Sequence, residues 1–337
     1  MASVFLPGIL EHIRVISDPE SNVFTDFAGT RFPQGSFPVL PSPDTRFINL
    51  QTDGDGFRSG SDEWSALVIG LLCFSSDFPV LMELGASQGL WSVPWIRHAE
   101  ILKLKGAHAL AVEASASKIQ SLNFWESQGL KFSTTHTKNG FKLSGTKWNF
   151  SWLHAAVNTH EGFVSFPDVN VESDNGASVN ILTHVGHRSR TIQVSSITPA
   201  GLANWLREAT LRDKIALLHL DLQGAEEFLV SDHDFKNLVS KTDVVVIGTH
   251  SIESEQISIK VMSKLGYCLL AINQSKYRYE DTKTLFQDGE QVWASKATVE
   301  RATELKLIKW TSNEEILADV VYELCLDRDT QGLTSEK

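Results

Sequence analysis

The stretch VLMELGASQGLW, residues 80–91, joins a short apolar run to a turn that contains two glycines. The run over 79–84 is typical of a buried strand, and it carries an acid, Glu83, near its end. Gly85 and Gly89 lack a Cβ, so the backbone can bend sharply here and a ligand can approach it. In open α/β sheets, ligands bind beyond the carboxyl ends of the strands. The stretch therefore predicts a strand-to-helix turn that borders a binding site.

Similar apolar runs alternate with helical patterns along most of the chain. We expect strands at 79–84, 108–113, 151–157, 215–221, 243–248 and 267–272, and a final pair of strands around DGEQVWA, 288–294. We expect helices from Ser61 onward and at 88–104, 115–128, 199–210 and 252–265. Apolar strands that alternate with helices predict a mostly parallel sheet covered on both faces. The predicted fold class is therefore α/β, doubly wound.

The sequence divides into three parts. Residues 1–60 are rich in Pro, Gly, Ser and Asp but also hold many aromatic residues, which predicts a loop-rich N-terminal extension packed on the core. Residues 61–310 form the expected main domain, with a polar hairpin or loop inserted at 130–150. In 311–337, apolar residues recur at helical spacing before a polar end, which predicts a C-terminal helix followed by a frayed tail.

Composition limits the partners that the protein can have. The 337-residue chain carries a formal net charge of −11, and most of such a surface repels a polyanion, so we expect no nucleic-acid partner. The first residues lack the basic segment and long apolar core of a signal peptide, and no apolar run is long enough to cross a bilayer. The three cysteines lie singly in apolar runs, which indicates buried thiols. We therefore expect a cytoplasmic protein without a membrane partner; composition does not set its oligomeric state.

The glycine turn departs from the dinucleotide fingerprint G-x-G-x-x-G, because Ser87 replaces the second glycine. The acid that remains, Glu83, suits a cationic ligand better than a pyrophosphate. The next strand ends in Glu113, and a carboxylate at that place can accept both hydroxyls of a ribose. One acid near a cation and one near a sugar match S-adenosylmethionine. A tight turn with two incidental acids is the simpler structural alternative.

Two further motifs place polar groups at strand ends. LLHLDLQGAEEFL, residues 217–229, ends a strand in Asp221 and continues to Glu226, and these acids can face the crevice, cap the next helix, or do both. DVVVIGTHS ends in His250 on the same rim. Histidine titrates near neutrality, whereas an unperturbed Asp has a pKa of about 3.9, so we expect His250 to be the base for an acceptor hydroxyl and Asp221 to orient it or the acceptor. In the alternative, which we do not favour, Asp221 and Glu226 hold a divalent cation that lowers the pKa of the hydroxyl.

The order of the motifs is that of a known family. MELGASQG, AVEAS, HAAVNTHEGFVSFP, LLHLDLQGAE, VVIGTHS and DGEQVWA follow one another as they do in FkbM-type S-adenosylmethionine-dependent methyltransferases, which the chain resembles from about 61 to 297. The resemblance implies a class I methyltransferase fold, Rossmann-like, with a seven-stranded sheet whose last strand is antiparallel. It also implies O-methylation of a hydroxyl on a sugar, glycoconjugate or natural product. The chain departs from the family in its 130–150 segment and in EAS, where many members have Pro after the acid.

The expected cofactor is therefore S-adenosylmethionine, and the expected acceptor is a small molecule or a saccharide. We expect the cofactor to be bound by Glu83, Gly85, Ala86, Ser87, Gln88, Gly89, Glu113, Ala114, Ala155 and Asp221. We expect the catalytic residues to be His250, Asp221 and Glu226, and we assign no residue to a resident metal. Two alternatives stay open: an NAD-dependent oxidoreductase on the same sheet, which the missing middle glycine counts against, and a non-catalytic module that binds the cofactor.

Overall fold

The computed structural model describes residues 2–3, 5, 23–25, 31–33, 59–74, 78–115, 118, 122–167, 191–280, 283–287 and 289–318. Most of the extension predicted for 1–60 lies outside these residues. Of the C-terminal part predicted for 311–337, residues 313–318 are helical and the rest lies outside. The two described cysteines, Cys73 and Cys268, are free and buried as expected, whereas Cys325 lies outside.

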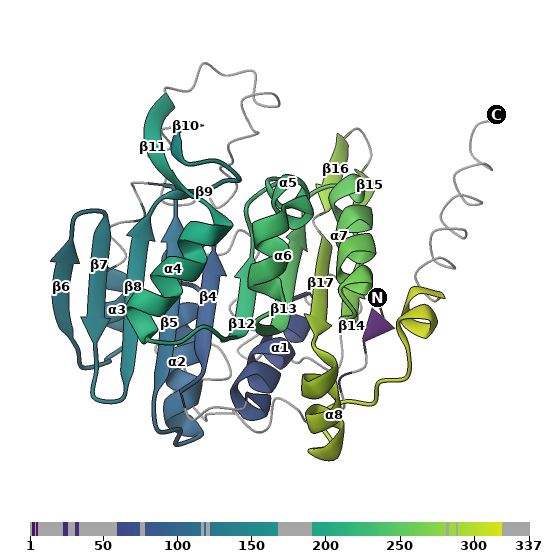
Figure 1. Cartoon of the computed structure of the whole chain (residues 1–337), viewed down its shortest axis with the longest axis horizontal. Coiled ribbons are helices and arrows are strands. Elements are labelled where there is room, and N and C mark those ends of the chain that lie inside the picture. The colour runs from purple at the N-terminus through teal and green to yellow at the C-terminus, as the bar shows by residue number, and fades with distance from the viewer. Residues whose placement is uncertain are drawn as a thin grey trace.

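A ten-stranded sheet forms the centre of the molecule (Figure 1). Seven of its strands are, in chain order, β4 (Val80–Leu84), β5 (Ala107–Glu113), β8 (Trp148–His154), β12 (Ile215–Leu220), β13 (Thr242–Thr249), β14 (Cys268–Asn273) and β17 (Gly289–Ala294). Their order in space is β14, β17, β13, β12, β4, β5, β8. From β13 to β8 all neighbours are parallel, whereas β17 is antiparallel to both β13 and β14. The predicted doubly wound sheet with an antiparallel last strand is confirmed.

Both edges of the sheet extend beyond these seven strands. At one edge, β1 (Ala2–Ser3) pairs with β14; at the other, β7 (Gly140–Ser144) pairs with β8, and β6 (Ser133–Thr137) pairs with β7. The hairpin predicted within 130–150 is present, but it continues the main sheet because Phe141 and Leu143 are buried while Lys142 between them is exposed. Its last residues belong to β8, which starts three residues before the predicted strand 151–157.

Helices cover both faces of the sheet. On one face lie α1 (Ser59–Cys73), α2 (Ser92–Ile101), α3 (Leu122–Ser127) and α8 (Lys296–Glu304); on the other lie α4 (Pro199–Thr210), α5 (Glu226–Ser231), α6 (His233–Val239) and α7 (Ile252–Lys264). Each strand serves both layers because successive side chains point to opposite faces. In β4, Val80, Met82 and Leu84 pack towards α4 and α6, whereas Leu81 packs towards α1 and α2.

Local sequence explains where most helices begin and end. Thr198 caps α4 by accepting from the Gly201 N–H and is followed by Pro199, and Ser251 caps α7 by accepting from the Ser254 N–H. The predictions 199–210 and 252–265 are therefore confirmed nearly to the residue. The predicted helix 88–104 is shorter, because 85–91 forms a turn before α2. Of the predicted helix 115–128, α3 confirms the part from Leu122 to Ser127, and most of 116–121 lies outside the described residues.

Smaller sheets rise at the carboxyl end of the parallel strands (Figure 1). One contains β9 (Ala156–Val157), β10 (Gly162–Pro167) and β11 (Thr191–Ile197), and another is the hairpin of β15 (Lys276–Glu280) and β16 (Lys283–Gln287). A further hairpin pairs β2 (Val23–Thr25) with β3 (Arg31–Pro33). Among the residues that the structure describes, no helix combines the length and apolar character needed to cross a membrane.

Candidate functional site

The strand order reverses between β4 and β12. The chain runs outward from β4 through β5 to β8 on one side, and from β12 to β13 on the other. In open α/β sheets such a point leaves a crevice beyond the carboxyl ends of the strands, and ligands bind there. The acids and the histidine predicted from the sequence all lie at this end: Glu83 on β4, Glu113 on β5, Asp221 after β12 and His250 after β13.

Gly85 brings the turn after β4 against the backbone that follows β12. Its φ is +80°, and a Cβ on it would lie 1.7 Å from the carbonyl oxygen of Asp221. The Asp221 N–H in turn donates to the Leu84 carbonyl at 2.9 Å. The protein's own backbone thus occupies the place that a Cβ on Gly85 would take, which gives Gly85 a role in fixing Asp221 relative to β4. The predicted approach of a ligand to Gly85 stays a prediction.

Glu83 caps α2. Its carboxylate accepts from the backbone N–H groups of Trp91 and Ser92, both at 3.0 Å, and from the Ser92 hydroxyl. A negative charge at a helix N-terminus is favourable because the first N–H groups have no partner within the helix. The side chain is only 1% exposed, and burial raises its pKa to about 7 against the opposing effects of His219 and of these hydrogen bonds. The structure thus shows Glu83 in contact with the helix, and its predicted contact with a cofactor cation stays a prediction.

Glu113 ties the glycine turn to the end of β5. One carboxylate oxygen accepts from the Ser87 N–H at 2.7 Å and the other from the Ser115 N–H at 2.6 Å. Burial raises the pKa of this carboxyl, and the two N–H donors and Lys118 oppose the rise. Ser87 itself has a φ of +48°, a left-handed conformation that aims its N–H at Glu113.

Three of the other predicted cofactor residues, Gly85, Ala86 and Ala155, contact the end of β5, whereas Gly89 lies against Trp125 and Phe150. The N–H groups of Gly85 and Ala86 donate to the Val112 carbonyl, and the Ala155 N–H donates to the Glu113 carbonyl. The His154 ring lies 3.0 Å from the Ala114 carbonyl. The structure thus brings the turn 85–89, the end of β5 and the residues after β8 into one rim. His154 was not predicted, because nothing in its sequence neighbourhood distinguishes it from other polar residues.

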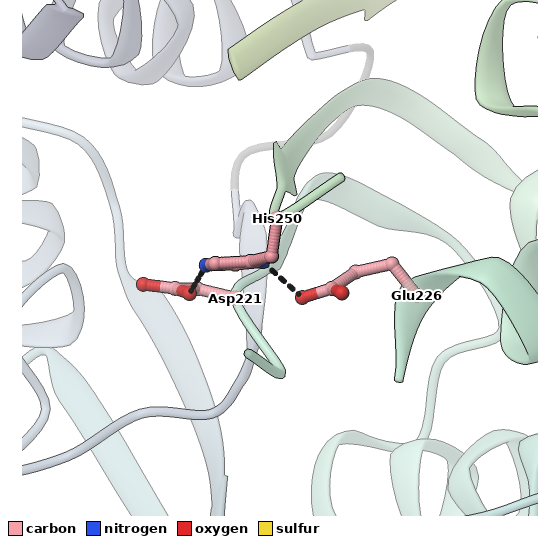
Figure 2. Close-up of side chains that lie close together, drawn as sticks. All are labelled: Asp221, Glu226 and His250. Atoms are coloured by element: carbon pink, nitrogen blue, oxygen red, sulfur yellow. Dashed lines mark ion pairs between the residues drawn. The ribbon is translucent and has the colours of Figure 1, made fainter. Parts of the chain in front are cut away.

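His250 lies between two carboxylates (Figure 2). Its Nε2 is 3.2 Å from an oxygen of Asp221, and its Nδ1 is 3.2 Å from an oxygen of Glu226. The Asp221 side chain is 43% exposed, the His250 side chain 10% and the Glu226 side chain not at all. The three predicted catalytic residues are therefore brought together, and only Asp221 presents a substantial surface to the crevice.

This pairing fixes the charge of His250. Burial alone lowers its pKa, but the hydrogen bonds and charges of Asp221 and Glu226 outweigh burial and raise the pKa to about 10. For Asp221, burial raises the pKa, and the hydrogen bond and charge of His250 overcome this and lower it. At neutral pH the pair is an imidazolium and a carboxylate. The raised pKa favours a His250 that is protonated on both nitrogens and so disfavours the predicted role of a base, which stays a prediction.

The same pairing bears on the cation alternative. Within the part of the chain that the structure describes, Asp221, Glu226 and His250 form a group whose candidate ligand atoms all lie within 4.8 Å of one another. Each ring nitrogen of His250 faces one of the two carboxylates. The expectation that no metal resides here stays a prediction.

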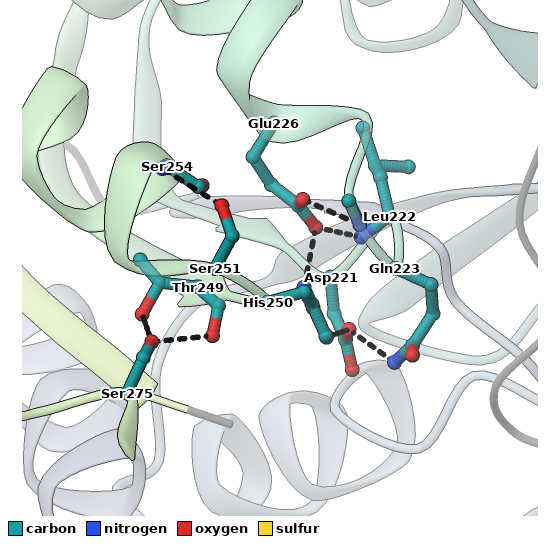
Figure 3. Close-up of polar contacts among 10 residues, drawn as sticks. Asp221, Leu222, Gln223, Glu226, Thr249, His250, Ser251, Ser254 and Ser275 are labelled. Carbon is teal, nitrogen blue, oxygen red and sulfur yellow. Dashed lines mark hydrogen bonds and ion pairs between the residues drawn. The ribbon is translucent and has the colours of Figure 1, made fainter. Parts of the chain in front are cut away.

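A hydrogen-bond network that the sequence did not reveal holds the end of β13 (Figure 3). The Ser275 hydroxyl donates to the Thr249 carbonyl at 2.9 Å, and the Ser275 N–H donates to the Glu255 carboxylate at 2.7 Å. Ser251, the residue after His250, begins α7 as its cap. His250 is therefore held from the strand before it and from the helix after it. The cap was readable from the sequence, but the contacts of Ser275 join segments that are far apart in the chain.

Comparisons with known proteins leave the family open. The chain matches no protein-family model, and a search of curated proteins finds no match. Among solved structures it is similar to the METTL16 methyltransferase domain, with 11% identity, 81% of this chain and 86% of that chain covered, and a TM-score of 0.37. It is also similar to the C-terminal domain of precorrin-6Y C5,15-methyltransferase from Rhodobacter capsulatus, with 14% identity, 72% and 91% covered, and a TM-score of 0.34. Trm1 from Pyrococcus horikoshii, solved with S-adenosyl-L-methionine, shows 10% identity, 85% and 64% covered, and a TM-score of 0.34. At these TM-scores the likeness assigns no activity, and the FkbM resemblance stays a prediction.

Proposed function

We propose that this chain is an S-adenosylmethionine-dependent methyltransferase that methylates a hydroxyl of a sugar, glycoconjugate or other small molecule. The observation that carries the proposal is that Glu83 fills the N-terminus of α2. In a dinucleotide site the pyrophosphate takes the first N–H groups of the helix after the first strand. Here Trp91 and Ser92 donate these groups to Glu83. The helix therefore favours a cofactor that brings no phosphate to this place.

The end of β5 fits the adenosine half of S-adenosylmethionine. A carboxylate offers about four acceptor positions, and the Ser87 and Ser115 N–H groups use two of those on Glu113. The others suit the two hydroxyls of a ribose. The residues next to Glu113, Ala114 and Ala155, have small side chains. When bound, this cofactor supplies a methyl group on a positively charged sulfur.

Asp221 is the group of this chain that we assign to the acceptor. Its exposed carboxylate can accept a hydrogen bond from a hydroxyl and so hold the acceptor oxygen in line with the methyl group. If the cofactor is bound there, the methyl–sulfur bond would break as the carbon–oxygen bond forms, with the neutral thioether as leaving group, and the Asp221 carboxylate would take the acidified acceptor proton. A base held within reach contributes about 10²–10⁴-fold to such a step, and positioning contributes about 7–11 kcal/mol. His250 keeps Asp221 ionised and orientated.

A binding measurement separates this proposal from an oxidoreductase. Calorimetry on the full chain should show binding of S-adenosylhomocysteine and none of NAD, because Ser87 and the start of α2 have no N–H groups left for a pyrophosphate. Binding of NAD alone would contradict the proposal. A result in which the protein binds neither S-adenosylhomocysteine nor NAD would also contradict the proposal.

A turnover assay then separates an enzyme from a non-catalytic module. The protein is incubated with methyl-labelled cofactor and a panel of sugars, glycoconjugates, phenols and an RNA oligonucleotide, and products are identified by mass spectrometry. We expect label on a hydroxyl of a small molecule and none on RNA, since the net charge of −11 disfavours a polyanion. Tight cofactor binding without any labelled product would favour a binding module.

A further inference from the structure

Glu226 is placed to act on the reaction without meeting the acceptor. Its side chain has no exposed surface, so no group in the crevice can reach it. Its three contacts all lead to the residues around Asp221: the N–H groups of Leu222 and Gly224 donate to its two oxygens, and His250 Nδ1 lies 3.2 Å from one of them. Figure 3 shows these contacts converging from the turn and from His250.

The turn that follows Asp221 depends on this carboxylate. Gln223 has a φ of +54° and Gly224 a φ of +101°, so both lie in the left-handed region. Successive residues of this kind aim their N–H groups into a concave site that suits an anion, and here the anion is Glu226. The same turn places the Gln223 amide, which donates to Asp221 at 2.9 Å. Glu226 thus fixes one of the two donors that orient the Asp221 carboxylate.

His250 is the second donor, and Glu226 fixes it too. Because Nδ1 faces Glu226, the ring is held with Nε2 towards Asp221. Both donors, Gln223 and His250, meet the same Asp221 oxygen. The second oxygen of Asp221 points away from His250 in Figure 2. Because two donors hold one carboxylate oxygen of Asp221, they also set the direction in which the second oxygen points.

The remaining charged groups around His250 are mostly acidic. Glu253 and Glu255 lie in the first turn of α7, and Glu290 on β17 pairs with Gly248 beside it. His219 on β12 is the basic neighbour, and its charge acts on Asp221. The Glu255 carboxylate is engaged by the Ser275 N–H, and Glu253 is exposed. Glu226 is thus the buried acid that contacts His250 directly on the side away from Asp221.

We propose that Glu226 is a positioning residue for methyl transfer, which orients the Asp221 carboxylate through His250 and through the turn 222–224. The inference rests on the proposed function for its effect on turnover, but not for its effect on His250. In Glu226→Gln the amide would have to point its NH₂ at a backbone N–H or at the imidazolium, so at least one contact is lost. The change should loosen Asp221 without touching either ligand.

The matched control is Glu227→Gln, which removes the same charge one residue along α5 from a partly exposed position. For Glu226→Gln we expect kcat to fall about 10- to 100-fold, the effect of losing a hydrogen bond to a charged group. The KM values and S-adenosylhomocysteine affinity should stay within about threefold. Glu227→Gln should behave as the parent protein. Equal kcat in the two variants would overturn the inference.

The dependence of turnover on pH distinguishes a positioning role of Glu226 from a merely structural one, because a structural role would not change it. In the parent protein His250 stays charged through neutral pH, so turnover should not follow a histidine titration between pH 6 and 9. In Glu226→Gln the pKa of His250 should fall, and turnover should decline as pH rises through the new value because Asp221 loses its charged partner. Loss of parent turnover on treatment with EDTA would overturn the inference, since a cation would then hold Asp221.

NMR titration of the His250 ring separates failure of this inference from failure of the proposed function. We expect the parent ring to titrate far above the ordinary histidine range and the Glu226→Gln ring to titrate lower. An ordinary pKa in the parent protein, or the same pKa in both proteins, would overturn the inference even if the cofactor binds. Absence of S-adenosylhomocysteine binding to the parent would overturn only the proposed function. If Glu226→Gln does not fold, Glu226→Asp keeps the charge but shortens the reach, and it should lower kcat and the His250 pKa in the same direction.

Discussion

Replacing Gly85 with Ala tests the contact that joins β4 to the candidate site. Two costs follow from the structure. The φ of +80° is unfavourable for a residue with a Cβ, by roughly 1–2 kcal/mol. The new Cβ would also lie 1.7 Å from the Asp221 carbonyl oxygen, so the two backbones must move apart by more than an ångström. That movement strains or breaks the Asp221–Leu84 hydrogen bond, at a further cost of about 1–3 kcal/mol.

Gly266 provides the matched control because it has the same φ of +80° but nothing within 4 Å of its would-be Cβ. Gly266→Ala should therefore cost only the conformational part, about 1–2 kcal/mol, whereas Gly85→Ala should cost about 2–5 kcal/mol in total. Urea unfolding at pH 7 with matched m values measures both. The displaced Asp221 should also reduce turnover in Gly85→Ala but not in Gly266→Ala. Equal destabilisation by the two substitutions would refute the close approach of Gly85 to Asp221.

Three further predictions address the charged groups. Glu113→Ala should weaken S-adenosylhomocysteine binding about 10- to 100-fold by calorimetry, because a hydrogen bond to a charged group contributes about 1.5–3 kcal/mol; unchanged affinity would place the ribose elsewhere. Asp221→Asn should lower kcat about 10²–10⁴-fold with little change in S-adenosylhomocysteine affinity, and full activity would exclude Asp221 as the proton acceptor. The unfolding free energy should fall as pH rises from about 6.5 towards 10. The pKa of His250 is near 6.5 in the unfolded chain and about 10 in the folded protein. Its ion pairs therefore stabilise the fold fully below pH 6.5, and this stabilisation is lost as pH rises through about 10. Between pH 6.5 and 8.5 the loss should be about 1–2 kcal/mol more in the parent than in His250→Asn, measured by urea unfolding, and parallel pH profiles would contradict the pairing.

The sequence allowed most of the sheet to be predicted because each central strand is a short apolar run followed by a polar turn. The strands β4, β5, β12 and β13 match their predictions to within one or two residues. The β6–β7 hairpin was predicted as a separate insertion because only alternate residues, such as Phe141 and Leu143, are buried. A half-buried edge hairpin and a polar surface loop have similar composition. What distinguishes the edge hairpin is the strand of the main sheet with which it pairs. That partner, β8, is set by tertiary packing.

Residue positions in the site were more predictable than residue roles. The carboxyl ends of parallel strands meet at one edge, so Glu113, Asp221 and His250 were expected at the same rim, and Asp221 and His250 are in contact there. The role of His250 was not predictable, because its pKa depends on Glu226, which a different element brings to its second nitrogen. The contact of Gly85 with Asp221 was not predictable for the same reason. The carbonyl oxygen that a Cβ on Gly85 would meet belongs to Asp221, more than a hundred residues later in the chain.

Glu83 shows why an acid at a strand end does not identify its own ligand. From the sequence, a carboxylate beside a glycine turn is equally suited to a cofactor cation and to the N–H groups of the next helix. The structure favours the second contact, because the Glu83 side chain is 1% exposed and already accepts from three donors at the start of α2. The proposed cofactor therefore stays the same, but the part that Glu83 plays in the argument for it changes. In our proposal Glu83 supports S-adenosylmethionine as the cofactor, because it occupies the N–H groups at the start of α2 that a pyrophosphate would need.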